Sequence, residues 1–329
     1  MTLDEVTDDL IGFFRDPAIL IGIPLALLGA VFMSFGAQYQ HRGVTKVERL
    51  SGSSGKAGLS GRQLLSLLKR PSWVAGTGML GLAIICQLSA LAFAPLIIVQ
   101  PIGAISLVIT TLLNSRVTGI KPTGRSVMAI IACVGGIFIF VTIAAFFATE
   151  NPVTPRETIV ILSLLGIVLL ALGGLWLWLR KRGQALFYIV ASGMIYGFVA
   201  TLAKVVIERI KANDFDWLTI LCIVALLAAV AIGAYFVQTA YAVGPPDLVI
   251  AGLTVVDPIV AVLIGLTVLQ EAANAPPWAF VGFGIAGIIA VFGVITLARF
   301  HPQVLFDSQE LPIQRGSTPP PPPGPEGDH

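Results

Sequence analysis

The chain is divided into apolar runs of about 20 residues that are separated by short polar loops. A helix must be about that long to cross the hydrocarbon core of a bilayer, so each run predicts one transmembrane helix. Only 12 % of the residues are charged, which is about half the share of a soluble domain. The sequence therefore predicts an all-α polytopic membrane protein with about nine transmembrane helices. The runs lie at about 19–38, 73–95, 96–115, 127–148, 158–179, 185–204, 217–243, 247–268 and 278–298.

The charge of the loops alternates along the chain. The loop after the first run carries seven lysines and arginines, and the loops after the third and fifth runs carry three each, whereas the segment before the first run is acidic. Because cytoplasmic loops collect Lys and Arg, the N-terminus is predicted outside and the C-terminus in the cytoplasm. This orientation places fifteen of the twenty basic residues inside. Lys204, Arg209 and Lys211 are exceptions, because this orientation places these three basic residues outside.

Parts of the first half of the chain recur in the second half. The first copy begins in the first run and the second copy in the sixth, so equivalent helices would cross the membrane in opposite directions. Such inverted repeats are typical of secondary transporters. The sequence thus predicts two inverted four-helix repeats joined by a connecting helix. The matched segments are Gly29 to His41 with Ser192 to Lys204, Gln87 to Pro95 with Gln238 to Pro246, and Gln100-Pro101 with Asp257-Pro258.

The repeat and the loop charges divide the chain into five parts. The last part contains a run of prolines, Pro319 to Pro323, and a segment of this composition buries too little apolar surface to fold. The predicted parts are an acidic external N-terminus (1–18), the first repeat (19–148, with a basic cytoplasmic loop at 39–72), a connector with helix five (149–184), the second repeat (185–300) and a disordered cytoplasmic tail (301–329).

Asp257 is the polar residue that most strongly indicates function. It lies near the middle of the eighth run, where a carboxylate costs on the order of 3 kcal/mol. Pro258 follows it and removes a helix hydrogen bond, which leaves the carbonyl of Thr254 without its usual donor. An acid beside a broken helix at mid-depth is typical of ion and proton sites in inverted-repeat transporters. The alternative is a protonated carboxyl that bonds to the backbone or to another polar side chain.

Other polar residues within the apolar runs are candidates for lining a substrate or ion pathway. Each has the alternative role of bonding a neighbouring helix. Gln100, beside Pro101, is expected to share one face of the third run with Asn114. Glu271 is predicted at the solvated outer end of the eighth run, and Lys204 is expected to pair with Glu208 one helical turn later. The remaining candidates are Gln38, Gln87, Gln238 and Tyr196.

The sequence lacks the residue sets that enzymes and nucleic-acid-binding proteins use. Its three cysteines and three histidines show no metal-ligand spacing, and it contains no Ser/His/Asp set, paired catalytic carboxylates or nucleotide motif. We therefore expect no enzymatic activity, no cofactor and no nucleic-acid partner. The expected partners are the lipid bilayer and a small-molecule or cation substrate, and a homodimer is left open. The Ala/Gly-rich composition and the absence of Asn-x-Ser/Thr predict a bacterial cytoplasmic membrane.

Two long motifs resemble a known superfamily. The segment AFAPLIIVQPIGAISLVITTLLNS, at Ala92 to Ser115, resembles the drug/metabolite transporters and in particular their NIPA-like branch. The segment GPPDLVIAGLTVVDPIVAVLIGLTVLQEA, at Gly244 to Ala272, is similar to general, EamA-like members. The resemblance covers roughly residues 22–298 and implies a nine-span layout. Eukaryotic NIPA-like proteins are described as magnesium transporters, and where they carry an acidic Gly-Glu pair this chain has Gly81-Leu82.

The sequence therefore predicts a secondary transporter that moves a small polar solute or cation by alternating access. Because no ATP-binding motif occurs, an ion gradient or the gradient of the solute itself must supply the energy. A NIPA-like magnesium transporter is the alternative within this class. A non-transporting accessory protein of a lipid or cell-envelope pathway is the alternative from another class.

Overall fold

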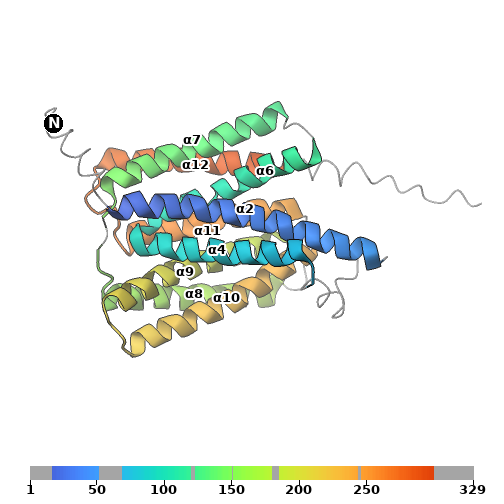
Figure 1. Ribbon diagram of the computed structural model, residues 1–329. Coiled ribbons are helices and arrows are strands. Elements are labelled where there is room, and N and C mark those ends of the chain that lie inside the picture. The colour runs from blue at the N-terminus through green and yellow to red at the C-terminus, as the bar shows by residue number, and fades with distance from the viewer. Residues whose placement is uncertain are drawn as a thin grey trace, which may run out of the picture.

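The computed structural model describes residues 17–51, 69–119, 123–149, 151–179, 185–243 and 246–299. Within these residues all regular structure is helical, and the helices form one antiparallel bundle (Figure 1). The prediction of an all-α membrane protein is confirmed. The helices are α2 (Pro17–Ser51), α4 (Pro71–Phe93), α5 (Leu96–Gly103), α6 (Ile105–Thr118), α7 (Gly124–Phe147), α8 (Pro155–Leu179), α9 (Ala185–Lys211), α10 (Trp217–Val243), α11 (Pro246–Thr267) and α12 (Pro277–Arg299).

The described helices supply about nine membrane-spanning segments. Eight candidate spans are long and apolar enough to cross a bilayer, and α5 and α6 together make one of them, Leu96–Val117. The ninth expected span corresponds to α11, whose apolar stretch Gly252–Thr267 is shorter than the others. The number of spans predicted from hydropathy is therefore confirmed.

The third span is broken, whereas α11 is continuous. Pro101 lies inside α5 and provides no amide hydrogen, and the helix ends two residues later at Gly103. The Ala104 N–H donates to the carbonyl of Pro101 at 3.2 Å, which closes a tighter turn before α6 begins. Pro258 also lies inside its helix, but α11 runs through it to Thr267. The two Pro positions that match in sequence thus differ in backbone conformation.

The helices pair in the order that an inverted repeat predicts. The first two helices of each half pack together, α2 with α4 and α9 with α10. In each half the first helix also packs on the third span, α2 on α5 and α6, and α9 on α11. The last helices of the two halves, α7 and α12, pack against each other, and α8 contacts α9 and α10. This pairing supports the division into two repeats, which stays a prediction.

Helix α2 is longer than its apolar run. It continues to Ser51 and so includes residues 39–51, which we expected to belong to the basic loop. These residues contain no proline, and nothing in their backbone chemistry stops the helix at the end of the apolar part. The predicted N-terminal segment (apart from its last two residues), the rest of the basic loop up to residue 68 and the predicted tail lie outside the described residues.

Candidate functional site

Asp257 lies near the middle of α11 and is followed by Pro258 inside the same helix. Its side chain is half-buried, and the Oδ1 atom is fully buried with no hydrogen-bond partner among the described residues. Nearly all buried polar atoms in folded proteins have a partner, and an exception marks a place where a proton, an ion or a water is expected. The carboxyl of Asp257 is therefore available for chemistry that the fold itself does not use.

Two glycines of α9 bring its backbone against α11 at the level of Asp257. A Cβ atom added to Gly193 would lie 2.6 Å from the Cβ of Val256, and one added to Gly197 would lie 3.0 Å from the carbonyl oxygen of Asp257. Small residues four apart on one helix face allow two transmembrane helices to approach closely. Our reading of the sequence missed this contact, although the Gly193-x-x-x-Gly197 spacing was its signal.

Tyr196 is the predicted site residue that the structure brings to Asp257. It lies on α9 between Gly193 and Gly197, the two glycines that pack against α11 at the level of Asp257. Its ring also lies along α10, because a Cβ atom added to Gly233 would be 3.3 Å from Cε2 of Tyr196. The hydroxyl of Thr254, one turn before Asp257, donates to the carbonyl of Ile250 in its own helix at 2.8 Å. Asp257, Pro258, Thr254 and Tyr196 therefore form one local group.

The other predicted site residues lie on other helices of the bundle and differ in burial. Gln38 in α2, Gln100 in α5 and Asn114 in α6 are buried. The single helix face expected for Gln100 and Asn114 is interrupted at Ala104, where the helix breaks. Pro101 and Gln87 are half-buried, and Gln238 on α10 is exposed.

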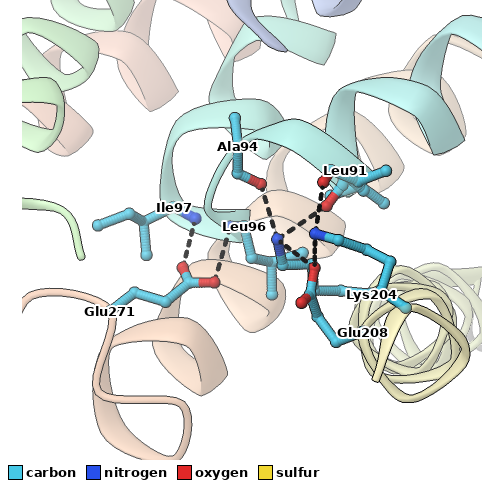
Figure 2. A network of polar contacts seen from close by, with 9 residues as sticks. Leu91, Ala94, Leu96, Ile97, Lys204, Glu208 and Glu271 are labelled. Atoms are coloured by element: carbon cyan, nitrogen blue, oxygen red, sulfur yellow. Dashed lines mark hydrogen bonds and ion pairs between the residues drawn. The ribbon is translucent and has the colours of Figure 1, made fainter. Parts of the chain in front are cut away.

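A second polar group lies where α4 ends and α5 begins (Figure 2). The Lys204 ammonium donates to the carbonyls of Leu91 and Ala94, at 2.8 and 3.1 Å, at the end of α4. The N–H groups of Leu96 and Ile97 donate to the two carboxylate oxygens of Glu271, both at 2.8 Å, at the start of α5. We call Lys204, Glu271 and these four backbone groups the α4–α5 clasp.

The clasp satisfies the helix ends at a buried break. The last carbonyls of α4 and the first N–H groups of α5 have no partner within their helices, and neither Ala94 nor Pro95 has a polar side chain to cap them. A cation at a helix C-terminus and an anion at an N-terminus also suit the helix dipoles. Lys204 and Glu271 are each only 4 % exposed, so hydrogen bonds to these backbone groups help to stabilise their buried charges.

Glu271 is thus not at a solvated end of its span, and that prediction is wrong. The chain turns back after α11 through Gln270, which has a positive φ of 51°, and the Glu271 N–H donates to the carbonyl of Gly265 at 3.0 Å. Gly265 leaves the space that the carboxylate needs, because a Cβ atom there would lie 2.8 Å from Oε2 of Glu271. The turn therefore directs the side chain inward, beneath α5.

The expected pair between Lys204 and Glu208 is present, with 3.4 Å between Nζ and Oε1. Lys211 also binds Glu208, at 3.0 Å, and donates to the carbonyl of Ala92 at 2.9 Å. Sequence reasoning found the local pair but missed the bonds to α4, because backbone carbonyls carry no sequence signature.

Arg209 completes the polar residues at the end of α9. It is 1 % exposed and donates through Nη2 to Asp216 at 2.7 Å and through Nε to Thr219 at 2.8 Å. The hydrogen bond from the Thr219 amide, joined by the Arg209 guanidinium, holds the pKa of the Asp216 carboxyl below its usual value. The three basic residues that run against the loop-charge pattern therefore all have structural partners at this end of the bundle.

Comparison with known proteins supports the resemblance seen in the sequence. The family described as "Magnesium transporter NIPA" matches residues 18–171. Over these residues the chain is NIPA-like. This NIPA-like chain is also similar to an uncharacterized protein of Corynebacterium glutamicum, with 26 % identity over 289 residues that cover 85 % of this chain and 95 % of the relative. No solved structure matches it significantly.

The family match ends before Asp257 and before the two charged residues of the clasp. Residue 171 lies in α8, whereas Asp257 and the charged residues of the clasp lie on or after α9. Within the described part of the chain, no group of three or more His, Cys, Asp or Glu side chains is placed to hold a metal ion. The NIPA-like chain thus carries its buried acid in the half that the family match does not cover.

Proposed function

We propose that this NIPA-like protein is a secondary transporter that moves a small polar solute or cation by alternating access, with Asp257 as its ion- or proton-binding residue. The observation that carries the proposal is the buried Oδ1 atom of Asp257, which has no hydrogen-bond partner among the described residues. A residue that binds and releases an ion in every cycle needs a ligand atom that the fold does not occupy.

The surroundings of Asp257 also suit a part that moves. Gly193 and Gly197 have no side chains, so the backbone of α9 lies directly against Val256 and Val260 of α11. Pro258 interrupts the helical hydrogen bonds at the same level, and prolines are where transmembrane helices commonly bend. A bend of α11 at this point changes what surrounds the carboxyl, as alternating access requires.

Magnesium is the second candidate substrate, and the matched family's description favours it. Mg²⁺ prefers carboxylate and carbonyl oxygens in octahedral geometry and retains several waters. Asp257 offers one carboxylate, and Gly81-Leu82 stands where an acidic pair occurs in NIPA-like proteins. A largely hydrated Mg²⁺ held by Asp257 and backbone carbonyls is the form of this candidate that the chain supports.

The test is flux into proteoliposomes that contain the purified full-length protein. Fluorescent indicators for pH and for Mg²⁺, enclosed in the vesicles, report proton and magnesium movement under imposed gradients. We expect Asp257→Asn, which keeps size and polarity but removes the ionisable group, to abolish the flux that the parent shows. Glu157→Gln is the matched control, because Glu157 is a half-buried carboxylate at the start of α8 that accepts a hydrogen bond from Thr154 at the start of its own helix.

The outcomes separate the alternatives. Loss of both signals in Asp257→Asn supports Asp257 as the shared binding residue. Magnesium uptake by Asp257→Asn at the parent rate and with the parent pH dependence contradicts the proposed role. A parent protein that moves neither protons, Mg²⁺ nor any of a panel of small polar solutes favours the non-transporting accessory protein.

A further inference from the structure

We propose that the α4–α5 clasp is the gate at its end of the transport path, and that Lys204 and Glu271 must both release the first half of the molecule before that end opens. The existence of a transport path rests on the proposed function, whereas the contacts of the clasp do not involve Asp257.

The clasp joins the two halves of the bundle. Its backbone groups belong to α4 and α5, in the first half, whereas Lys204 lies on α9 and Glu271 follows α11, in the second half (Figure 2). Further contacts at this end cross between the halves in the same way. The Thr149 N–H, after α7, donates to the carbonyl of Glu271 at 2.7 Å, and Lys211 of α9 donates to the carbonyl of Ala92. Separation of the halves at this end therefore breaks charge-assisted bonds.

Lys204 already has a second partner for the open state. Glu208, on the same face of α9, lies 3.4 Å from Nζ while Lys204 still binds α4. An unpaired buried charge is strongly unfavourable, so a gate residue needs an alternative partner when its first one leaves. When α4 moves away, Lys204 exchanges the carbonyls of Leu91 and Ala94 for Glu208 without leaving its own helix.

For Glu271, the alternative partner in the open state is water. Its neighbours in the turn after α11, Gln270, Ala273 and Asn274, are exposed. A small rotation of this turn brings the carboxylate from the start of α5 to solvent. Both charges of the clasp can therefore be stabilised in a closed and in an open arrangement, which is what a two-state gate requires.

The start of α8 shows what a purely local cap looks like in the same protein. The Thr154 N–H donates to Glu157 at 2.8 Å, and the Glu157 N–H donates to the Thr154 hydroxyl at 3.3 Å. This capping box joins residues three apart in the sequence. Glu271 performs the same chemistry on α5 from 175 residues away. A cap contributed by the other half of the bundle couples the helix end to the relative position of the halves.

The experiment measures the distance across the clasp in the full-length protein. Spin labels are placed at Phe93→Cys, the exposed end of α4, and Asn274→Cys, in the exposed turn after α11. The buried cysteines Cys86, Cys133 and Cys222 are replaced by alanine. Distances are recorded by pulsed electron resonance in lipid nanodiscs, without substrate, and the melting temperature reports folding.

We expect one short distance in the labelled parent and an added population at longer distance in Glu271→Gln, because the Gln amide nitrogen faces an N–H group that it cannot accept from. Lys204→Met is the second variant, since it removes the other charge and leaves the Glu271 cap in place. The matched control Glu157→Gln should keep the parent distribution. Folded variants that both keep the parent distribution contradict the gate. Loss of folding in both variants also contradicts it, because the clasp is then only structural.

This readout is independent of transport. Opening in Glu271→Gln, together with flux that is insensitive to Asp257→Asn, would retain the gate and reject the proposed role of Asp257. An unchanged distance together with loss of flux in Asp257→Asn would reject the gate and retain the proposed function.

Discussion

The two halves of the bundle contain matching helix crossings that are completed in different ways. In the first half, the Ser34 hydroxyl of α2 lies 2.8 Å from the carbonyl of Ser106, just after the break between α5 and α6. In the second half, Gly197 of α9 occupies the position that matches Ser34, and it lies against the carbonyl of Asp257 without donating a hydrogen bond. At the first crossing the Ser34 hydroxyl lies between the carbonyls of Ser106 and of Ala30 in its own helix, both at 2.8 Å, whereas the second crossing leaves a buried carboxyl oxygen without a partner among the described residues.

The difference indicates that the two crossings have different roles. The first-half crossing has its helix already broken and the Ser34 hydroxyl within hydrogen-bond distance of the chain after the break, so its shape is set by the fold. The second-half crossing has a continuous helix, a proline and a carboxyl that is still available. We infer that the first crossing supports the structure and that the second responds to the ion.

Separate substitutions of the polar residue before each proline test this difference most directly. Asp257→Asn should abolish ion-dependent flux, because it removes the carboxyl group at the second crossing. Gln100→Leu, at the matching position in α5, should retain most of the flux, since that crossing is expected to have a structural role. Flux in proteoliposomes at several pH values measures both. Equal losses in the two variants would show that the halves share the ion site.

Added volume at the second crossing should have the next largest effect. Gly197→Ala places a Cβ atom 2.7 Å from that of Val260, so α9 and α11 must separate. Overpacking of this kind costs about 1–3 kcal/mol. Gly166→Ala in α8, where a Cβ atom meets nothing within 4 Å, is the control and should be neutral or slightly stabilising. Reversible unfolding in mixed micelles compares the two, and equal stabilities would mean that the crossing is loosely packed.

Loss of the hydroxyl at the first crossing should have a smaller effect. Ser34→Ala removes one hydrogen bond within the membrane-spanning region, and such bonds contribute about 0.6 kcal/mol on average. Transport should continue, and the same unfolding assay should detect the modest loss of stability. A loss of flux as complete as in Asp257→Asn would contradict a purely structural first crossing.

The smallest expected effect concerns Asp216, outside both crossings. Its pKa is lowered in the folded protein by the Thr219 amide and by Arg209, so its contribution to stability is present above its unfolded pKa of about 3.9. That contribution is lost as the pH falls through the lower, folded pKa. Asp216→Asn should flatten the acid side of the stability curve without changing the pH dependence of flux. A changed pH dependence of flux in Asp216→Asn would indicate that Asp216 takes part in the ion or proton binding that we propose for Asp257.

The elements that depend on local chemistry could be predicted from the sequence, and those that depend on distant backbone groups could not. Apolar length alone located the spans, and a carboxylate at mid-depth identified Asp257. The break after Gln100-Pro101 and the continuity through Asp257-Pro258 could not be separated, because both dipeptides remove the same hydrogen bond and the surrounding helices decide the result. The clasp was missed for a related reason, since the partners of Lys204 and Glu271 are main-chain atoms.

The end of the family match at residue 171 affects how function is inherited among relatives. A protein that resembles this chain only over α2 to α8 shares its scaffold without sharing the acid on α11. If Asp257 binds the ion as proposed, substrate chemistry can diverge while the first half is retained, because the two are encoded in different stretches of sequence. Relatives are better grouped by the residue that aligns with Asp257 than by overall identity, and those with an uncharged residue there are expected to use a different driving ion or none.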